Sequence, residues 1–360
     1  AAREAFKIAD IFRARDVPVI MGGVHPTFRT AECLQHADAV CIGEGETIWT
    51  DMLQDWEANR LKKIYQAQTP MNPVILPTLN RTLFPKKGYL IHNTVLTSRG
   101  CPHYCDFCLV KNLYGPQYRL RKIADVVAEV ESLQPGPKPL VFVDDNIVGD
   151  PAFAKELFRA LIPLKIKWLS QCSITITEDD ELLDLAAQSG CRGLFIGFES
   201  IHPHNLHAFH KDINRVENFY RAVRKLKAHR IFVHGAFIFG FDGDDDTVFE
   251  KTLTFARDLE LAVANFGILT PYPGTILFDR LEKEKRIFDY DWSHYDSAHV
   301  VFTPQKMDPA TLQKGQYYAM KEFYSFSSMF QRLGVAASPF LWILNLAHLN
   351  IVKELKKIAQ

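Results

Sequence analysis

The sequence predicts an α/β chain whose largest part is a partial TIM-type barrel of six β/α units. Between residues 89 and 287, short β-rich runs alternate with amphipathic helical stretches, and this alternation predicts parallel strands wrapped by helices. Ahead of the barrel, residues 1–61 alternate helix and strand with glycine after each strand, a pattern typical of a doubly wound parallel sheet. The last part, residues 288–360, is rich in aromatic residues and mostly helical in pattern.

The N-terminal part contains only the second half of such a sheet. Residues 17–21 and 39–42 read as short strands, followed by Gly-Gly at 22–23 and by Gly-Glu-Gly-Glu at 43–46. The chain begins mid-pattern and without an initiator Met, so we expect a piece cut from a longer protein. Residues 62–88 lose the apolar periodicity and contain four prolines, which predicts a linker between the domains.

The barrel elements follow in order. Its predicted strands are residues 91–97, 140–143, 168–174, 193–198, 232–239 and 265–269, and its predicted helices are residues 123–133, 152–161, 179–189, 216–229 and 247–259. Thr177 and Asp180 suggest a capping box for the third helix, and Gly190 suits its C-terminal end. Because parallel strands of a barrel present their carboxyl ends to one mouth, the chemistry is expected there.

Composition limits the classes of function. Of 360 residues, 42 are Lys or Arg and 42 are Asp or Glu, and this balance argues against binding to a nucleic-acid backbone. Residues 340–352 are the nearest approach to a membrane span, but polar residues interrupt them. They read as a core helix, with a helix on a membrane surface as the alternative. We therefore expect a cytoplasmic protein, with peripheral membrane association as the second interpretation.

The cysteines point to one thiolate site. Of 7 cysteines, Cys101, Cys105 and Cys108 fall within one short segment, and the others are scattered. A secreted disulfide framework would spread its cysteines as pairs, so this usage favours a reducing compartment. Three thiolates on one loop can hold a four-iron cluster, which takes one Cys per iron and so keeps one iron free for another ligand.

The other interpretation of this loop is structural zinc, with His103 or His92 as the fourth ligand. Spacing alone leaves the two interpretations about equal. Two features favour the cluster: the loop follows the first predicted barrel strand, and the aromatic Phe107 stands directly before the third cysteine.

On this C-x3-C-x2-C motif in its barrel setting, the sequence resembles the radical S-adenosylmethionine (SAM) enzymes. The resemblance implies that the three cysteines hold a [4Fe–4S] cluster whose free iron binds the amino and carboxylate groups of SAM. One-electron reduction then cleaves SAM to methionine and a 5′-deoxyadenosyl radical, which abstracts hydrogen from an unactivated carbon. A barrel mouth lined by apolar residues would keep such a radical from water.

The resemblance also implies SAM contacts at the strand ends, at Phe107, Asp144, Asp145, Glu199 and Tyr272. For the aspartates an acidic turn cap is an equal alternative, whereas a buried Glu199 without a role would be unfavourable. Residues 240–244 close the fifth strand, where glycines allow close approach of the backbone and a plain turn explains the acids as well.

Residues 19–27 and 38–46 resemble the end of the cobalamin-binding domain that precedes many such barrels. There, Gly22 and Gly23 would let the nucleotide tail of the cofactor pass close to the backbone. The earlier strands of that domain are missing, so we expect His25 to have a loop or supporting role and this piece to bind cobalamin weakly or not at all. Residues 292–333 are similar to the hopanoid C-2 methylase group, in which Tyr295, His294 and His299 would line a pocket or pack under the barrel.

The leading hypothesis is therefore a cobalamin-dependent radical SAM enzyme that methylates an unactivated carbon of a small molecule or of a lipid such as a hopanoid. One SAM would supply the methyl group and a second the radical, with flavodoxin or ferredoxin as the electron donor. Two alternatives remain: a radical SAM cyclisation or rearrangement without methyl transfer, and a zinc-stabilised barrel that acts as a binding module.

Overall fold

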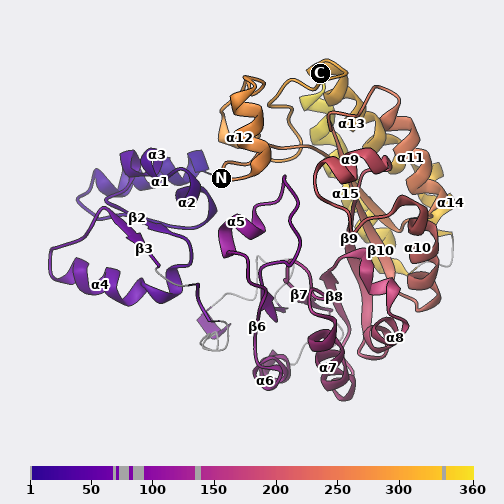
Figure 1. The fold of residues 1–360 in the computed structure, drawn as a ribbon, viewed down its shortest axis with the longest axis horizontal. Coiled ribbons are helices and arrows are strands. Elements are labelled where there is room, and N and C mark those ends of the chain that lie inside the picture. The colour runs from indigo at the N-terminus through magenta and orange to yellow at the C-terminus, as the bar shows by residue number, and fades with distance from the viewer. Residues whose placement is uncertain (1, 68–69, 73–80, 84–92, 134–138, 335–337) are drawn as a thin grey trace.

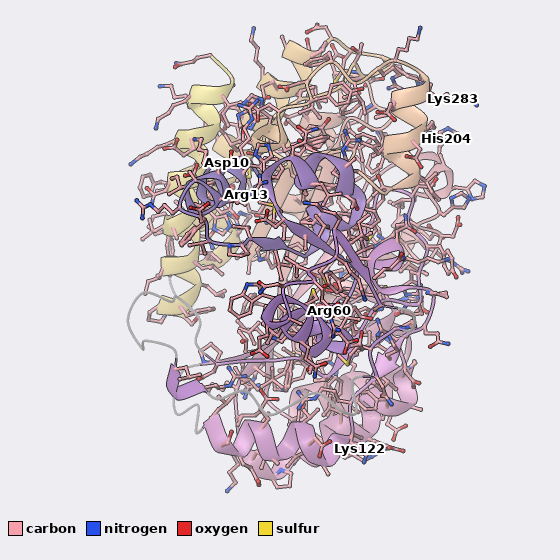
Figure 2. The ribbon with its side chains drawn as sticks, turned by 90° about the vertical axis from the view of Figure 1, so that its left-hand side faces the viewer. Asp10, Arg13, Arg60, Lys122, His204 and Lys283 are labelled. Carbon is pink, nitrogen blue, oxygen red and sulfur yellow. The ribbon has the colours of Figure 1, made fainter. Side chains whose placement is uncertain are left out.

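The computed structural model describes residues 2–67, 70–72, 81–83, 93–133, 139–334 and 338–360 (Figure 1). An N-terminal unit in indigo lies beside a larger barrel unit, and the last helices, in orange and yellow, cover the far side of that barrel. Figure 2 views the molecule from the N-terminal side, with Asp10, Arg13 and Arg60 in front of the barrel and Lys122 below them at the start of a barrel helix.

The N-terminal unit is a three-stranded parallel sheet of order β1-β2-β3. Its strands are β1 (Ile20–Met21), β2 (Ala39–Ile42) and β3 (Ile64–Gln66), and its helices are α1 (Ala2–Arg13), α2 (Val24–Phe28), α3 (Thr30–His36) and α4 (Trp49–Glu57). The predicted helix–strand alternation with parallel pairing is confirmed. The stretch predicted as a linker, residues 62–88, begins with β3, which pairs with β2. Three residues are too short to give a periodicity that sequence reasoning could detect.

The barrel unit contains a six-stranded parallel sheet of order β11-β10-β9-β8-β7-β4, as the sequence predicted. Its strands are β4 (Thr94–Val95), β7 (Leu140–Phe142), β8 (Trp168–Gln171), β9 (Cys191–Glu199), β10 (Phe232–Phe239) and β11 (Val263–Ile268). Consecutive neighbours pair in register, for example Ala236 with Gly197 and Phe237 with Phe266. Part of the first predicted strand, residues 91–92, lies outside the described residues.

The five predicted barrel helices lie close to their predicted positions; they are α6 (Ile123–Leu133), α7 (Pro151–Leu161), α8 (Asp180–Gln188), α10 (Phe219–Ala228) and α11 (Val248–Asp258). Three shorter helices were not predicted: α5 (Val110–Tyr114), α9 (Pro203–Ala208) and α12 (Ile276–Lys283). The predicted capping box is wrong: Asp179 caps α8 by accepting from the Leu182 N–H, and the Thr177 hydroxyl donates to the Ile174 carbonyl instead. Thr177 belongs to a 3₁₀ turn, η5 (Ile174–Glu178), which ends the predicted strand early.

Gly190 ends α8, as predicted, with a φ of 101° that favours glycine. A Cβ at this position would lie 1.9 Å from the Ile166 carbonyl oxygen, which belongs to the backbone. Gly190→Ala is therefore expected to destabilise the fold by about 2–4 kcal/mol, since strain and a clash add. Urea unfolding measures the change, and Gly334→Ala, with a φ of 65° and open space around its Cβ, separates strain from clash. Equal losses of unfolding free energy in the two variants would show that the clash with the Ile166 carbonyl contributes nothing.

The C-terminal helices cover the open edge of the barrel at β11. They are α13 (Pro309–Phe323), α14 (Phe326–Leu333) and α15 (Pro339–Ile358). The Tyr324 hydroxyl donates to the Ala264 carbonyl at 2.8 Å and accepts from the Ala264 N–H, which anchors this region on β11. Phe323 is buried as a core stripe requires, but Phe330 is 55% exposed. Within the described ranges, no helix has both the length and the apolarity needed to cross a bilayer.

Candidate functional site

The cysteine loop lies between β5 (Ser98–Arg99) and α5. Sequence reasoning expected this loop directly after the first barrel strand, but β5 intervenes and pairs antiparallel with β6 (Arg119–Leu120). All three loop thiols are free and partly exposed, whereas the other four cysteines are buried. The Cys108 N–H donates to the Cys105 carbonyl at 3.0 Å, a tight turn that brings these two cysteines to one side of the loop.

The loop is bound across the mouth of the barrel. The Asp106 N–H donates to the Phe209 carbonyl at 3.2 Å, and the Asp106 carbonyl accepts from the Leu277 N–H at 3.1 Å. Phe107 packs against Phe209 and Phe241, with ring centroids 6.3 and 6.2 Å apart. The cysteines are therefore held at the carboxyl ends of the strands, where barrel chemistry is expected.

A buried cation faces this loop. The Lys211 ammonium lies 3.2 Å from a Glu199 carboxylate oxygen, and their side chains are only 16% and 11% exposed. Burial would lower the pKa of Lys211, but the negative charges of Glu199 and of the Cys105 thiolate raise it overall. Burial raises the pKa of Cys105 to about 12, against the opposing effect of Lys211. A bound metal stabilises thiolates and would offset the unfavourable effect of burial on the ionisation of Cys105. Lys211 would balance the added negative charge.

The donor set fits an iron–sulfur cluster in number and type. Three thiols share one anchored loop, and burial, which is the main influence on each, raises the pKa of all three. Among the described residues, no three His, Cys, Asp or Glu side chains converge as ligands of a metal ion. His103 lies within the loop, whereas His92, the other predicted zinc ligand, lies outside the described residues.

The structure distinguishes Asp144 from Asp145, for which the sequence offered the same two roles, a SAM contact or an acidic turn cap. Asp144 is buried and accepts hydrogen bonds from the N–H and hydroxyl groups of Thr97 and Ser98, so it joins β7 to the segment between β4 and β5. Asp145 lies near the Gly100 backbone and near the thiols of Cys101 and Cys108. Burial first, and then the charge of Asp144, raise the pKa of Asp145 to about 6.

Glu199 sits in a strained position at the end of β9. Its φ is 64°, rare for a residue with a side chain, and its carboxylate occupies the space beside Gly197. A Cβ on Gly197 would lie 2.1 Å from a Glu199 carboxylate oxygen, so any larger residue there would displace the Glu199 carboxylate. Asn214 donates to the Gly197 and Phe198 carbonyls at 2.8 and 2.9 Å and supports this strand end. The SAM contact predicted for Glu199 stays a prediction.

The remaining strand ends differ in character. Asp244 accepts from the Gly240 and Phe241 N–H groups and from the Asn205 amide, so this motif is a buried turn. The Tyr272 hydroxyl lies 3.3 Å from the Ser297 hydroxyl and lines the mouth next to α12. The Asp244 turn and Tyr272 both follow the carboxyl ends of barrel strands. Of the two residues, only Tyr272 belongs to the predicted SAM contacts.

Gly22 and Gly23 directly follow β1 in the N-terminal sheet. Gly23 has a φ of 103° and open space around its Cβ position, and Gly22 packs beside Cys41. His25 lies 3.4 Å from a Glu32 carboxylate oxygen and contacts the Trp292 ring edge-on at 5.3 Å. These contacts agree with the predicted supporting role of His25 at the junction between the two units.

Sequence reasoning missed the residues that join the two units. The Trp292 indole N–H donates to Glu32 at 2.7 Å, and Arg3 pairs with Asp291 at 2.8 Å. Lys211 was also missed, because a lone Lys in a loop carries no motif. Only the topology, which brings this loop over the cysteines, reveals it.

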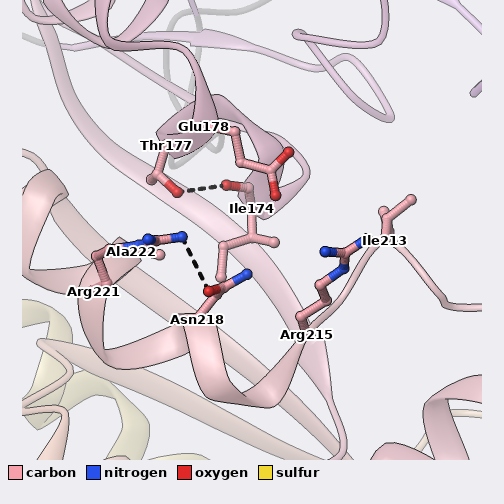
Figure 3. Close-up of a pocket in the computed structure, with 8 residues that line it drawn as sticks. All are labelled: Ile174, Thr177, Glu178, Ile213, Arg215, Asn218, Arg221 and Ala222. Carbon is pink, nitrogen blue, oxygen red and sulfur yellow. Dashed lines mark hydrogen bonds between the residues drawn. The ribbon is translucent and has the colours of Figure 1, made fainter.

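A separate small pocket lies between η5 and α10 (Figure 3). Arg221 and Asn218 in its wall are joined by a hydrogen bond of 3.0 Å. None of the residues lining it is a cysteine of the loop or a predicted SAM contact, so it carries no part of the site.

Comparison with known proteins decides the family. Residues 95–256 match the Radical SAM superfamily. Over 96% of the chain, the sequence is 33% identical to the bacteriochlorophyllide d C-12(1)-methyltransferase of Chlorobaculum tepidum, of which it covers 77%. The chain belongs to the radical SAM superfamily. Members of this superfamily use a [4Fe–4S] cluster and SAM, and the predicted family is confirmed.

Two further proteins are similar to this radical SAM chain, one in sequence and one in structure. The hopanoid C-2 methylase of Rhodopseudomonas palustris is 27% identical over 77% of the chain and 54% of that protein. The solved structure of TsrM from Kitasatospora setae, a radical SAM methyltransferase with cobalamin and a [4Fe–4S] cluster bound, superposes with a TM-score of 0.72 at 18% identity. It covers 98% of this chain and 84% of TsrM, so the fold of both units is shared.

Proposed function

We propose that this protein is a cobalamin-dependent radical SAM methyltransferase that acts on an unactivated carbon. The observation that carries the proposal is the anchored cysteine loop at the mouth of a six-stranded parallel barrel, beside a sheet that ends in Gly22 and Gly23. When bound, the cluster supplies the electron that cleaves SAM, and cobalamin carries the methyl group from a second SAM to the substrate.

Each residue has a proposed task. Cys101, Cys105 and Cys108 hold three irons, and Lys211 balances the charge of the thiolates. Asp145, which has spare acceptor capacity at the rim, accepts from the ammonium of SAM. Phe107 and Tyr272, both packed against the core, exclude water from the carbon that reacts.

Glu199 completes the rim as the proposed contact to the polar end of SAM. Its ion pair with Lys211 and its strained backbone hold the carboxylate in one orientation. Gly22 and Gly23 present backbone without side chains to cobalamin.

We propose a polycyclic substrate with a large apolar surface. The two named methyltransferase relatives act on bacteriochlorophyllide d and on hopanoids, which share this character, and the first is both more similar and covered further. Bacteriochlorophyllide d is therefore the first substrate to test, with a hopanoid as the second.

The test supplies anaerobic, reconstituted protein with cobalamin, a low-potential reductant such as reduced flavodoxin or ferredoxin, SAM labelled at the methyl carbon, and one substrate at a time. Label in the substrate together with 5′-deoxyadenosine supports methyl transfer. Deoxyadenosine with an altered but unlabelled substrate would favour cyclisation or rearrangement. Colourless protein with stoichiometric zinc and no cleavage of SAM would overturn the proposal in favour of the binding module.

We also propose peripheral contact with an anionic lipid surface through α14 and the N-terminal half of α15. Apolar side chains point outward there, Ile343 at 66% and Leu346 at 43% exposure, while the polar Asn345 and His348 are buried. Exposed lysines follow at 353, 356 and 357 and complement anionic headgroups.

Sedimentation with phosphatidylglycerol vesicles tests this contact. We expect the protein to pellet with them, to remain in solution with neutral vesicles, and to lose binding in Ile343→Asp. The control Ile276→Asp removes an equally exposed residue from α12 and should bind as the wild type does. Dimerisation through this face, seen as a doubled mass that Ile343→Asp abolishes, would contradict the lipid assignment.

A further inference from the structure

A buried ionic junction connects the N-terminal sheet to the strand that leads into the cysteine loop. Glu44, directly after β2, places one carboxylate oxygen 2.6 Å from Arg99 and the other 2.7 Å from Arg119. The side chains of these three residues are 6%, 13% and 8% exposed. The Met71 N–H donates to the same carboxylate at 3.0 Å. A charge network this well enclosed holds its partners in fixed positions.

The two arginines need this carboxylate. Arg99 and Arg119 are direct partners in the antiparallel ladder of β5 and β6, and like charges in such a pair repel. Glu44 gives one oxygen to each guanidinium, and it balances the two positive charges together with Glu46, which binds Arg99 from its exposed side. Without Glu44, Arg119 would have no carboxylate partner in this junction and the repulsion between the two buried cations would increase, so β5 and β6 would separate or admit water.

The position of Arg99 constrains the position of Cys101, the first cysteine of the loop. Only Gly100 stands between them, with a φ of 94° and a Cβ position 2.9 Å from the Gln117 carbonyl oxygen, so the turn has little freedom. The residue before Arg99 is also fixed, because Asp144 accepts from the Ser98 N–H and hydroxyl groups. Arg99 is therefore the link through which the N-terminal unit can act on the loop.

We propose that Glu44 is a positioning residue that holds the cysteine loop in place from the N-terminal unit, so that retention of the cluster depends on the contact between the two units. This inference rests on the proposed function, since it assigns the loop to a cluster. It makes the Gly-Glu-Gly-Glu segment at 43–46 part of the cluster site, although that segment lies outside the barrel.

The chain provides a matched control in Glu46, which lies on the same segment and binds the same Arg99 at 2.9 Å but is 41% exposed. Glu44→Gln removes the buried charge with almost no change in volume. We expect iron to be lost to a chelator about tenfold faster from reconstituted Glu44→Gln than from the wild type, and less than twofold faster from Glu46→Gln. The bleaching of cluster absorption measures both rates.

Thiol labelling before reconstitution gives a second readout without a cluster. The four scattered cysteines are buried, so under native conditions a thiol reagent reports on the loop, and slow labelling of the other four reports on global unfolding. Glu44→Gln should change the labelling rate of the loop severalfold and leave the slow phase unchanged. Arg99→Lys, which keeps the charge but cannot span both glutamates, should give an intermediate change in the same direction.

The inference fails if Glu44→Gln and Arg99→Lys both label and lose iron at the wild-type rates, or if only the slow phase moves, since that would mark a general effect on stability. If the wild type assembles no cluster, the proposed function fails. The labelling comparison still decides whether Glu44 positions the loop.

Discussion

Cys105→Ser is expected to abolish the brown colour of the reconstituted protein and to reduce SAM cleavage by at least a thousandfold. A cluster with three thiolates loses a ligand to one of its irons, and serine is a poor replacement at the pH where cysteine already needs the metal to ionise. Visible absorption, bound iron and 5′-deoxyadenosine formation measure the loss. The same result is expected for Cys101→Ser and Cys108→Ser.

The matched control for this prediction is Cys191→Ser, because Cys191 is buried at the first residue of β9, the opposite end of that strand from Glu199. It should keep full iron content and lose stability only. A Cys105→Ser variant that still held four irons and cleaved SAM would show that the loop is not the ligand set.

Asp145→Asn is expected to weaken SAM binding by about 10–100-fold while leaving the fold intact, because it removes the charge that we propose pairs with the ammonium of SAM. The pKa of Asp145 is raised to about 6, so its carboxylate is mostly ionised above pH 6 and becomes neutral below it. Wild-type affinity should therefore fall as the pH drops below 6. The affinity of Asp145→Asn should be far less sensitive in this range, and equilibrium dialysis with labelled SAM measures both.

Asp144→Asn, at the neighbouring position, is the control that distinguishes an effect on SAM binding from an effect on folding stability. The new amide would turn an N–H donor toward the N–H groups of Thr97 and Ser98, so we expect a loss of about 2–4 kcal/mol of folding free energy. If Asp145→Asn binds SAM as the wild type does, while Asp144→Asn binds none at normal stability, the two roles must be exchanged.

The cysteine loop and the order of the barrel elements could be predicted because they depend on local patterns. The C-x3-C-x2-C spacing of the cysteines lies within one loop. Strands such as β10 alternate buried and less buried residues within a single stretch of sequence. The capping residue of α8 was misassigned because Thr177 and Asp179 offer competing caps, and only the 3₁₀ turn η5 decides between them. β3 was missed because its stability comes from pairing with β2.

The roles of Asp144 and Asp145 could not be predicted for a different reason. The two residues are identical and adjacent, and their difference arises from what another strand places in front of each: Thr97 and Ser98 in front of one, Gly100 in front of the other. Lys211 and Glu44 likewise acquire their importance from partners that are far away in the sequence.

By itself, then, the sequence determined the family, the parallel barrel and the three thiols, since each is encoded in residues that are close together along the chain. Only the tertiary structure decided which charges surround those thiols and which unit holds their loop. Burial fixes the energy of a charge, and burial comes from segments that meet only when the chain has folded.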